Sequence, residues 1–459
     1  MQREKFGSRL GFILISAGCA IGLGNVYRFP IITGAYGGGA FVLMYIAFLL
    51  ILGLPVMLAE LSVGRASQRS IATSFDVLER PKQKWHLMKF AGISGNYLLM
   101  MFYCVISGWM FIYFYKYVTG SIVNTTDPAA LGEAFGAVAS DAPLNIYATY
   151  GVIILCFGIC ALGLIKGVER ITKYMMLALL GLLVGLAVYS CTLDGAGEGL
   201  SFYLIPSFDK MQEAGIYEVV SAAMGQAFFT LSVGIGSIAV FGSYINKDRR
   251  LLGEAVTIIS LDTMVAIVAG FIVFPACFTF AGGVNVDLNN LGASFLFTTL
   301  SSMFNQMPGG QIIGSLFFLF MMFAALSTVI AVFENIVSFW LELTSIKKRW
   351  IVCLINIGLM MVLCLPAIFS NSIWSGMTFL GSIFDIEDKT VSNFLLPVGS
   401  LVYVVFCTYR FGWGSKNFLK EVNTGKGLKT PRWVVHYMKY ILPVVILVVF
   451  VFSLIQMFA

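Results

Sequence analysis

The chain has 459 residues, of which 59% are hydrophobic and only 11% are charged, and its mean hydropathy is +0.89. A soluble globular domain carries about 25% charged residues, so this composition excludes a soluble protein and indicates one that crosses a membrane many times. The net charge of +6 comes from basic residues spread among short loops, which gives no patch for a nucleic acid.

A helix needs about 20 mostly apolar residues to cross a bilayer. The sequence predicts eleven such spans, near residues 10–32, 38–63, 89–120, 146–164, 170–192, 216–245, 251–281, 310–343, 348–367, 384–410 and 434–457. Lys and Arg are concentrated in every second loop, which predicts a cytoplasmic N-terminus and, with eleven spans, an external C-terminus. The long segment 286–303 is expected to form a helical external loop that could act as a lid.

Two of these spans are interrupted. The first contains Ala17-Gly-Cys-Ala-Ile-Gly-Leu-Gly-Asn-Val-Tyr-Arg28, and the sixth contains a second break within 228–236. Glycine costs about 1 kcal/mol relative to alanine in a helix, and a central arginine costs at least about 3 kcal/mol on insertion scales. Unwound backbone at membrane depth is tolerated only where it is buried or lines a cavity. Two broken spans at corresponding places in two halves therefore predict a transporter binding site.

The residues of the first break suit a cation and a carboxylate. Where the helix unwinds, the carbonyls of Gly18, Ala20 and Ile21 lose their helical partners and can face a hard cation. The amides near Leu23 and Gly24 can face a carboxylate. The alternative is that the glycines only permit tight helix packing. That alternative leaves the polar side chains at the end of the break unexplained.

Five motifs carry a resemblance to a known family: Arg9-Leu-Gly11, 17–30, Gly37-Gly-Gly-Ala-Phe41, Glu60-Leu-Ser-Val-Gly-Arg65 and 225–234. Over almost the whole chain they resemble the neurotransmitter:sodium symporter family, and the eleven spans and short termini are similar to its bacterial transporters of tyrosine and of several hydrophobic amino acids. The resemblance implies an all-α polytopic membrane protein of eleven transmembrane helices, with an inverted five-plus-five repeat and broken helices 1 and 6. It also implies a bacterial inner membrane location.

The implied repeat divides the chain into three parts. The first inverted repeat is 1–192 with spans one to five, the second is 193–410 with spans six to ten, and 411–459 holds a cytoplasmic loop and span eleven.

The resemblance implies two sodium sites. The first would use the Ala20 carbonyl, Asn25, Thr230 and Asp262, together with the substrate carboxylate. The second would use the carbonyls of Gly18, Ile21 and Ala324 with the hydroxyls of Ser327 and Thr328.

Asp262 lies inside span seven, where many relatives carry asparagine. An ionised carboxylate there is costly unless a cation lies beside it. Chloride-dependent relatives hold an anion in a pocket matched here by Tyr45, Gln226, Thr230 and Ala266, and Ala266 offers no hydroxyl to chloride. We therefore predict that Asp262 is both a sodium ligand and the fixed negative charge, so that transport is chloride-independent. A protonated or purely structural aspartate is the alternative.

The implied substrate pocket is apolar and uncharged, which suits a neutral hydrophobic side chain. Tyr103 matches the family tyrosine whose hydroxyl meets the substrate carboxylate, and Phe229 matches the aromatic lid. Tyrosine, phenylalanine, tryptophan, leucine and methionine remain open, and an aromatic substrate is favoured by analogy. The implied lining is Cys19, Ala20, Leu23, Gly24, Leu99, Tyr103, Phe229, Thr230, Ser232, Ile235, Thr328, Val329 and Val332.

Two charged pairs are implied as gates. Arg28 would meet Asp388 on the outer side, and Arg3 would meet Glu342 near Tyr244 on the inner side. Exposed ion pairs contribute only about 0–1 kcal/mol, which suits contacts that must open and close. Glu342 could instead be an ordinary interfacial carboxylate.

Two further buried acids need an explanation. Glu60 is expected to accept amides freed by the break in span six. Glu334, inside span eight where relatives often have glutamine, could join the inner network or carry a proton.

These features predict a sodium-coupled symporter that imports neutral hydrophobic amino acids by alternating access. Its partners would be the amino acid, sodium ions and membrane lipid, with no nucleic acid and no obligate protein partner. We expect no enzymatic activity, because the sequence shows no nucleophile–base pair, metal cluster or phosphate-binding loop. The alternatives are a proton-coupled amino-acid transporter of the same architecture and, in a different class, a substrate-gated channel or nutrient receptor.

Overall fold

The computed structural model describes residues 5–213, 215–280, 295–376 and 381–458, and these residues are almost entirely helical. The helices that end before residue 205 are α1 (Arg9–Ala20), α2 (Phe29–Ala35), α3 (Gly39–Phe48), α4 (Leu54–Ser67), α5 (Ser74–Leu78), α6 (Met88–Val118), α7 (Pro128–Ser140), α8 (Ala142–Ala161), α9 (Arg170–Ser190) and α10 (Ala196–Leu204). The remaining helices are α11 (Phe208–Glu213), α12 (Ile216–Leu231), α13 (Ser237–Tyr244), α14 (Leu251–Phe280), α15 (Ser301–Gln306), α16 (Gly310–Leu343), α17 (Arg349–Leu363), α18 (Leu365–Ser370), α19 (Ile383–Lys389), α20 (Leu396–Thr408), α21 (Ser415–Val422), α22 (Arg432–Tyr440) and α23 (Leu442–Phe458).

Within these described residues, 9 helices are long and apolar enough to cross a membrane, or up to 10 if α1 and α2 count as one bent span. The prediction of a multi-pass all-α membrane protein is therefore confirmed. The remaining predicted span corresponds to α12 and α13, which have 16 and 8 residues and are each too short to cross alone. The count of eleven depends on joining these two helices and stays a prediction.

Both predicted breaks are present. The chain bends by 56° between α1 and α2, and a π-helical turn over Gly24–Arg28 follows the end of α1. The second break separates α12 from α13. There Ser232 takes a left-handed conformation with φ 50°, and Gly234 and Gly236 have φ 103° and 83°. Because left-handed backbone is open to glycine at little cost, these two glycines allow the helix to stop and restart.

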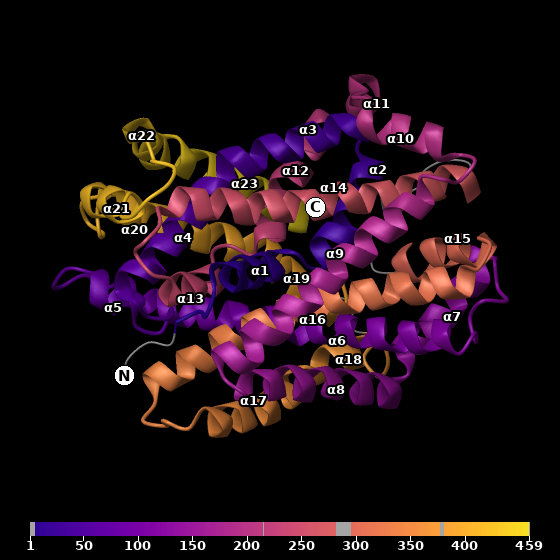
Figure 1. The fold of residues 1–459 in the computed structure, drawn as a ribbon, viewed down its shortest axis with the longest axis horizontal. Helices are drawn as coiled ribbons and strands as arrows, with labels where there is room; N and C mark the ends of the chain where they lie inside the picture. The colour runs from indigo at the N-terminus through magenta and orange to yellow at the C-terminus, as the bar shows by residue number, and fades with distance from the viewer. Residues whose placement is uncertain (1–4, 214, 281–294, 377–380, 459) are drawn as a thin grey trace.

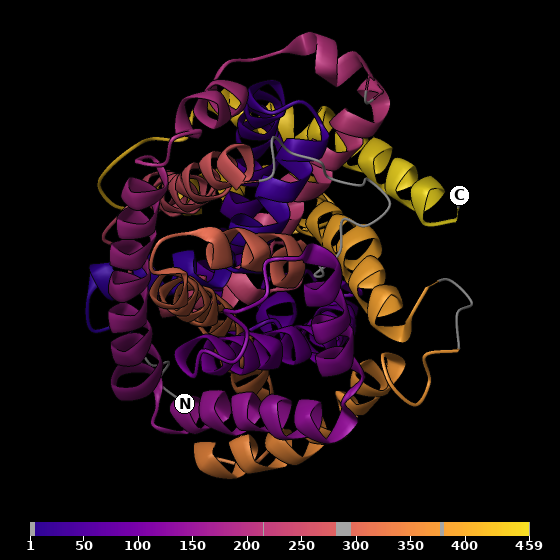
Figure 2. The same ribbon diagram turned by 90° about the vertical axis from the view of Figure 1, so that its right-hand side faces the viewer.

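The broken helices lie in the middle of the molecule, where α1 and α13 run beside the long helix α16 (Figures 1 and 2). The helix α16 also packs along α6, and α13 packs closely on α4. Small residues permit the second contact: a side chain at Gly64 or Gly242 would collide with the backbone of the facing helix. Such close approach is common between membrane helices, and it anchors the second break to α4.

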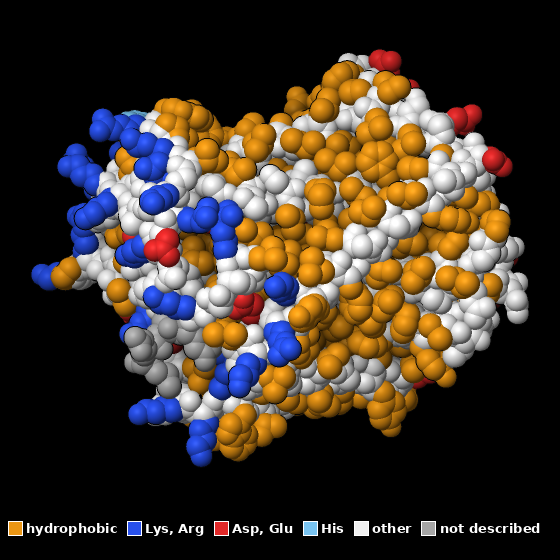
Figure 3. Space-filling view, in the orientation of Figure 1, with side chains coloured by type: hydrophobic (Ala, Val, Ile, Leu, Met, Phe, Trp, Pro, Cys, Tyr) orange, Lys and Arg blue, Asp and Glu red, His pale blue; other side chains and the backbone are white. Residues whose placement is uncertain are grey.

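The charges are segregated along the molecule. In Figure 3 the Lys and Arg side chains gather at the end that carries α5 and α21, whereas Asp and Glu mark the opposite end near α10 and α11, with an apolar surface between them. The predicted orientation rests on this asymmetry. Of the predicted lid at 286–303, residues 286–294 lie outside the described part of the chain, and Leu296–Leu300 forms a π-helical turn that leads into α15.

Candidate functional site

Five buried oxygen atoms from the end of α1 and the middle of α16 converge. The Ser327 hydroxyl lies 3.1 Å from the Gly18 carbonyl oxygen and 2.9 Å from the Ala324 carbonyl oxygen. The Thr328 hydroxyl lies 3.2 Å from the Gly18 oxygen and 3.4 Å from the Ile21 oxygen. All five residues predicted for the second sodium site thus meet. A cluster of neutral oxygens without a buried amine suits a hard cation.

The break explains why these carbonyls are available. In an intact helix the Gly22 amide would donate to the Gly18 carbonyl. Here it donates instead to the Asn25 side-chain oxygen at 3.2 Å. The Asn25 amide likewise donates to the Gly22 carbonyl at 3.2 Å, which leaves the Ile21 carbonyl without its usual helical donor. Asn25 therefore frees two carbonyls to face α16, the Gly18 carbonyl through its side-chain oxygen and the Ile21 carbonyl through its backbone amide.

A second cluster surrounds Asp262, which lies fully buried in the middle of α14. Its carboxylate accepts from the Asn25 side-chain amide at 2.8 Å and lies 3.2 Å from the Thr230 hydroxyl. None of the ion pairs among the described residues involves Asp262. The three side chains predicted for the first sodium site thus meet, and Ala20 lines the adjoining cavity. A buried carboxylate without a cationic side chain is a candidate cation ligand.

A small cavity of about 20 Å³ lies between the two breaks, and its size suits about one water. Tyr103 lies at one side, where its hydroxyl accepts from the Leu23 amide at 3.1 Å. A side chain at Gly22 would collide with this hydroxyl and with that of Thr328, so glycine is required there. The full lining is Ala20, Gly22, Gly24, Leu99, Tyr103, Phe229, Thr230, Ser232, Thr328 and Leu396.

Five residues predicted for the substrate pocket do not line this cavity. Leu23 lines an outer cavity instead, and Cys19 contributes its carbonyl oxygen to the Ser232 hydroxyl at 3.4 Å. Ile235, Val329 and Val332 are buried but do not reach the cavity. Gly22 and Leu396 line it and were not predicted. Gly22 belongs to the glycine-rich break and could have been included, whereas nothing in its local pattern singles out Leu396.

A larger cavity of about 270 Å³ adjoins the small one; it is called the outer cavity because the predicted orientation places it on the external side. Tyr103 and Phe229 line both cavities and therefore separate them. The Arg28 guanidinium lies 4.4 Å from the centre of the Phe229 ring, a cation–π contact that holds the ring over the small cavity. Arg28 and Asp388 both line the outer cavity, but among the described residues no ion pair joins them. Both side chains predicted for the outer gate thus line the same cavity, and their gating role stays a prediction.

The side that is predicted to face the cytoplasm holds a polar network that the sequence predicted only in part. The Tyr244 hydroxyl donates to Glu334 at 2.7 Å, and the fully buried Glu334 also forms an ion pair with Arg349. Glu334 therefore joins an inner network. Arg349 was missed because it ends the basic run Lys347-Lys-Arg349, which reads as loop charge. Its ion pair instead ties the start of α17 to α16.

Of the two charged residues predicted for the inner gate, Arg3 lies outside the described residues. Its expected partner Glu342 accepts from the Ser70 amide and the Thr73 hydroxyl, each at 2.8 Å. Glu342 thus binds the loop between α4 and α5, a contact that the sequence did not indicate.

Glu60 holds the second break. Its buried carboxylate accepts from the amides of Gly234, Ile238 and Ala239 at 2.8, 3.1 and 3.3 Å. The prediction that Glu60 accepts amides freed by this break is confirmed. A negative charge at the N-terminal end of α13 is also favourable because the helix dipole is positive there.

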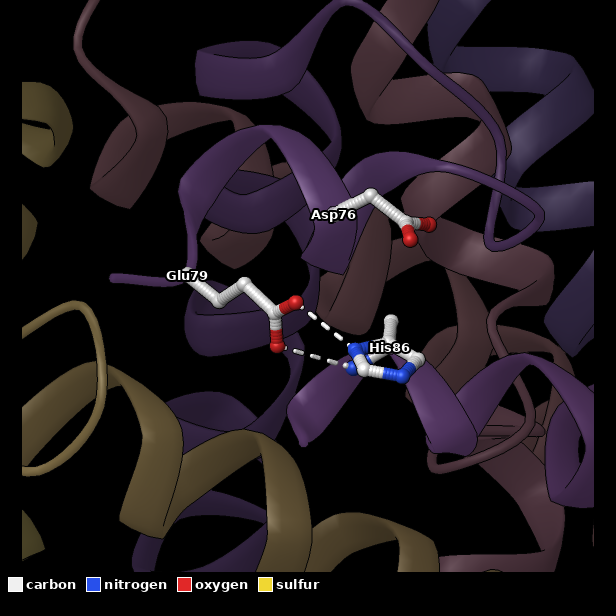
Figure 4. Close-up of side chains that lie close together, drawn as sticks. All are labelled: Asp76, Glu79 and His86. Carbon is white, nitrogen blue, oxygen red and sulfur yellow. Dashed lines mark hydrogen bonds and ion pairs between the residues drawn. The ribbon is translucent and has the colours of Figure 1, made fainter. Parts of the chain in front are cut away.

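A third group of polar side chains lies outside the central region, on α5 and the loop that leads to α6. Figure 4 shows Asp76, Glu79 and His86 near one another. Glu79 accepts from the His86 ring nitrogen at 2.7 Å, and Asp76 pairs with Lys89 at 3.5 Å. Each carboxylate already faces a basic side chain, so we read this group as ion pairs that fix the loop.

The sequence matches the sodium:neurotransmitter symporter family over residues 3–127 and 143–459. An uncharacterised sodium-dependent transporter of Haemophilus influenzae is 30% identical, over 99% of this chain and 98% of that protein. The sodium-dependent transporter YhdH of Bacillus subtilis is 31% identical, over 97% and 96%. The crystal structure of MhsT in complex with L-phenylalanine is similar with a TM-score of 0.86 and 34% identity, over 98% of this chain and 100% of that one.

The family match spans nearly the whole chain, and the relatives match end to end. The resemblance seen in the motifs is therefore confirmed, and with it a multi-pass membrane transporter rather than an enzyme. This chain belongs to the sodium:neurotransmitter symporter family.

Proposed function

We propose that this transporter is a sodium-coupled symporter that imports neutral hydrophobic, preferably aromatic, amino acids by alternating access. The observation that carries the proposal is the pair of oxygen clusters at the first break, one around Asp262 and one around Ser327 and Thr328. Both clusters share backbone or side-chain atoms of the same break. A cation in either one would therefore hold the break in the conformation that forms the central cavity.

The two clusters are proposed to hold one sodium ion each. The ion at Asp262 would balance a buried carboxylate, whereas the ion at Ser327 and Thr328 would be held by neutral oxygens. A tenfold sodium gradient supplies about 1.4 kcal/mol per ion, and 100 mV adds about 2.3 kcal/mol per net charge. Two ions are thus enough to concentrate a neutral amino acid strongly.

The substrate is proposed to lie between Tyr103 and the breaks. Its carboxylate would meet the Tyr103 hydroxyl and the amides near Leu23, and Phe229 would cover it from outside. The cavity lining carries no charged side chain that could neutralise a charged substrate side chain. The similar structure of MhsT holds L-phenylalanine, which supports an aromatic substrate. The cavity must widen to admit one.

Transport is proposed to be chloride-independent. Ala266 is buried and offers no hydroxyl, and the Gln226 amide donates to the Gly24 carbonyl at 2.8 Å. The Asp262 carboxylate, one turn before Ala266 in α14, would repel an anion at this place.

The wider arrangement follows the family. We propose two inverted repeats over 1–192 and 193–410 and a final part over 411–459, in a bacterial inner membrane with the N-terminus inside and the C-terminus outside. The segregated basic and acidic ends support this orientation.

Binding of tritiated phenylalanine to the purified protein tests the proposal. Binding should saturate with sodium chloride and equally with sodium gluconate, and it should be absent in choline chloride. Binding that required chloride would contradict the chloride claim. Binding that followed pH and ignored sodium would instead favour proton coupling, because a buried carboxylate such as Asp262 can also take a proton.

A further inference from the structure

Beneath the central cavity lies a second polar group that the proposed sodium and carboxylate contacts do not use. The Asn96 side-chain amide donates to the carbonyl oxygens of Gly92 and Ile235 at 2.7 and 2.8 Å. Its side-chain oxygen accepts from the Ser237 hydroxyl at 3.1 Å and from the Asn335 side-chain amide at 3.0 Å. The three polar side chains in this group are fully buried.

These contacts fix which way each amide points. Because the Asn96 nitrogen lies between two carbonyls, its oxygen must face Ser237 and Asn335. Asn335 must then present its side-chain nitrogen to Asn96, so its side-chain oxygen faces away from Asn96. That oxygen is buried and finds no hydrogen-bond donor among the described residues. A buried acceptor without a donor is unfavourable, so a ligand that supplies one would be favoured.

The helix spacing puts this group within reach of the far end of a long substrate in the proposed binding mode. Asn96 precedes Tyr103 by seven residues in α6, and Asn335 follows Thr328 by seven in α16. Tyr103 and Thr328 line the same cavity, and Asn96 and Asn335 touch, so the two helices run antiparallel here. Seven residues of helix span about 10 Å. An aromatic amino acid held by its carboxylate at Tyr103 would bring its para position close to Asn335.

A substrate that extends from the cavity at Tyr103 to Asn335 would pass between Leu99 and the second break. Ile235 packs against Gly95, where any side chain would collide with it. The cavity of about 20 Å³ is much smaller than a phenol ring, so a substrate enters only when a neighbouring side chain moves. The Ile235 side chain is buried as well as packed against Gly95, so it must move together with its neighbours to admit a substrate.

We propose that Asn335, oriented by Asn96, accepts a hydrogen bond from a donor at the para position of an aromatic substrate, so that the transporter selects tyrosine over phenylalanine. This inference rests on the proposed function, because it places the substrate carboxylate at Tyr103. Asn335 is thus a specificity-determining residue, and Asn96 positions it. Phenylalanine would fit the same space but leave the acceptor unpaired.

Competition with para-substituted analogues tests this on the unaltered protein. Tyrosine and 4-aminophenylalanine carry a donor, whereas phenylalanine, 4-fluorophenylalanine and 4-methoxyphenylalanine do not. The two donors should compete with labelled tyrosine at concentrations at least about tenfold lower than the others, which corresponds to about 1.4 kcal/mol. Equal competition by all five would overturn the inference. Failure of every analogue to bind in sodium would contradict the proposed function as well.

A matched pair of variants then assigns the effect. Asn335→Leu removes the acceptor with little change in size and should bring the tyrosine-to-phenylalanine ratio to about one, chiefly by weakening tyrosine. Asn305→Leu is the control, because Asn305 also has a buried side-chain oxygen without a donor among the described residues but lies in α15 at the outer end. It should leave the ratio unchanged. A ratio that survived in Asn335→Leu would overturn the inference, and the analogue series stands if that variant fails to fold.

Discussion

The Asn25 side-chain amide donates to the Asp262 carboxylate at 2.8 Å, and this contact joins the first break to the middle of α14. The Asn25 oxygen accepts from the Gly22 amide, so one side chain both shapes the break and orients the buried acid. The carboxylate and the freed carbonyls lie on either side of the same few residues. In the proposed function, this arrangement would couple the two ions and the substrate through one short segment.

Replacing Asp262 by asparagine should weaken the proposed first sodium site. Asp262→Asn keeps an oxygen but removes the charge that attracts the cation, so we expect the sodium concentration for half-maximal phenylalanine binding to rise about tenfold or more, or about 1.4 kcal/mol. Asp194→Asn, which removes a charge at an exposed position, is the control. An unchanged sodium requirement in Asp262→Asn would exclude this acid as a ligand.

Removing one hydroxyl should weaken the proposed second site. Ser327→Ala deletes an oxygen that lies near the Gly18 and Ala324 carbonyls, and we expect sodium affinity to fall about tenfold while phenylalanine binding at saturating sodium is retained. Ser315→Ala is matched to it: the same helix loses a hydroxyl whose only hydrogen bond among the described residues is to the Gln311 carbonyl, at 2.7 Å. If both variants kept wild-type sodium titrations, the second cluster would not be an ion site.

The Tyr103 hydroxyl should be needed for substrate affinity. Tyr103→Phe removes the proposed carboxylate donor and leaves the Leu23 amide without its acceptor, a loss of about 1–3 kcal/mol. Phenylalanine affinity measured in saturating sodium should therefore fall at least about tenfold. Tyr113→Phe removes another buried hydroxyl of α6, one without a hydrogen-bond partner among the described residues. Equal effects of the two variants would argue against a carboxylate at Tyr103.

The Glu60 carboxylate should stabilise the second break. In the wild type, three backbone amides donate to the Glu60 carboxylate. Glu60→Gln replaces one acceptor oxygen by an amide group that is itself a donor. We therefore expect a lower thermal midpoint and weaker transport. Glu198→Gln, at an exposed position in the first turn of α10, should change neither. A Glu60→Gln protein as stable and active as the wild type would show that the amides find other acceptors.

The buried pair of Glu334 and Arg349 should show strong coupling. Arg349→Gln leaves the Glu334 charge buried and uncompensated, which costs about 3–5 kcal/mol, so the thermal midpoint should drop. The double variant Glu334→Gln with Arg349→Gln should recover most of the loss. If the double variant lost as much stability as the two single variants together, the two side chains would act independently.

The sequence predicted which residue types form the site better than it predicted which of them are in contact. The first break could be predicted because several glycines together with Asn25 and Arg28 are unfavourable in an intact membrane-spanning helix. Glu60 could be assigned because a buried acid needs hydrogen-bond donors. Tyr244 was expected near Arg3 and Glu342, and its hydroxyl also meets Glu334, a contact that the sequence did not specify. Such contacts depend on how helices distant in sequence cross, which local patterns do not encode.

The residues that sequence reasoning missed share this cause. Arg349 reads as one of three adjacent loop charges, yet it folds back onto a helix that ends before it. Asn96 and Asn335 read as single polar residues in apolar helices, and only the packing of α6 on α16 brings them together. Leu396 reaches the cavity from α20 in the same way.

Concentrative uptake into proteoliposomes tests the central claim most directly. Labelled tyrosine and phenylalanine would be offered with an inward sodium gradient, and then with potassium or choline in place of sodium at fixed pH and membrane potential. Accumulation above the external concentration only with the sodium gradient is the predicted result. Equal accumulation without sodium, or equilibration without accumulation under every gradient, would contradict sodium-coupled symport.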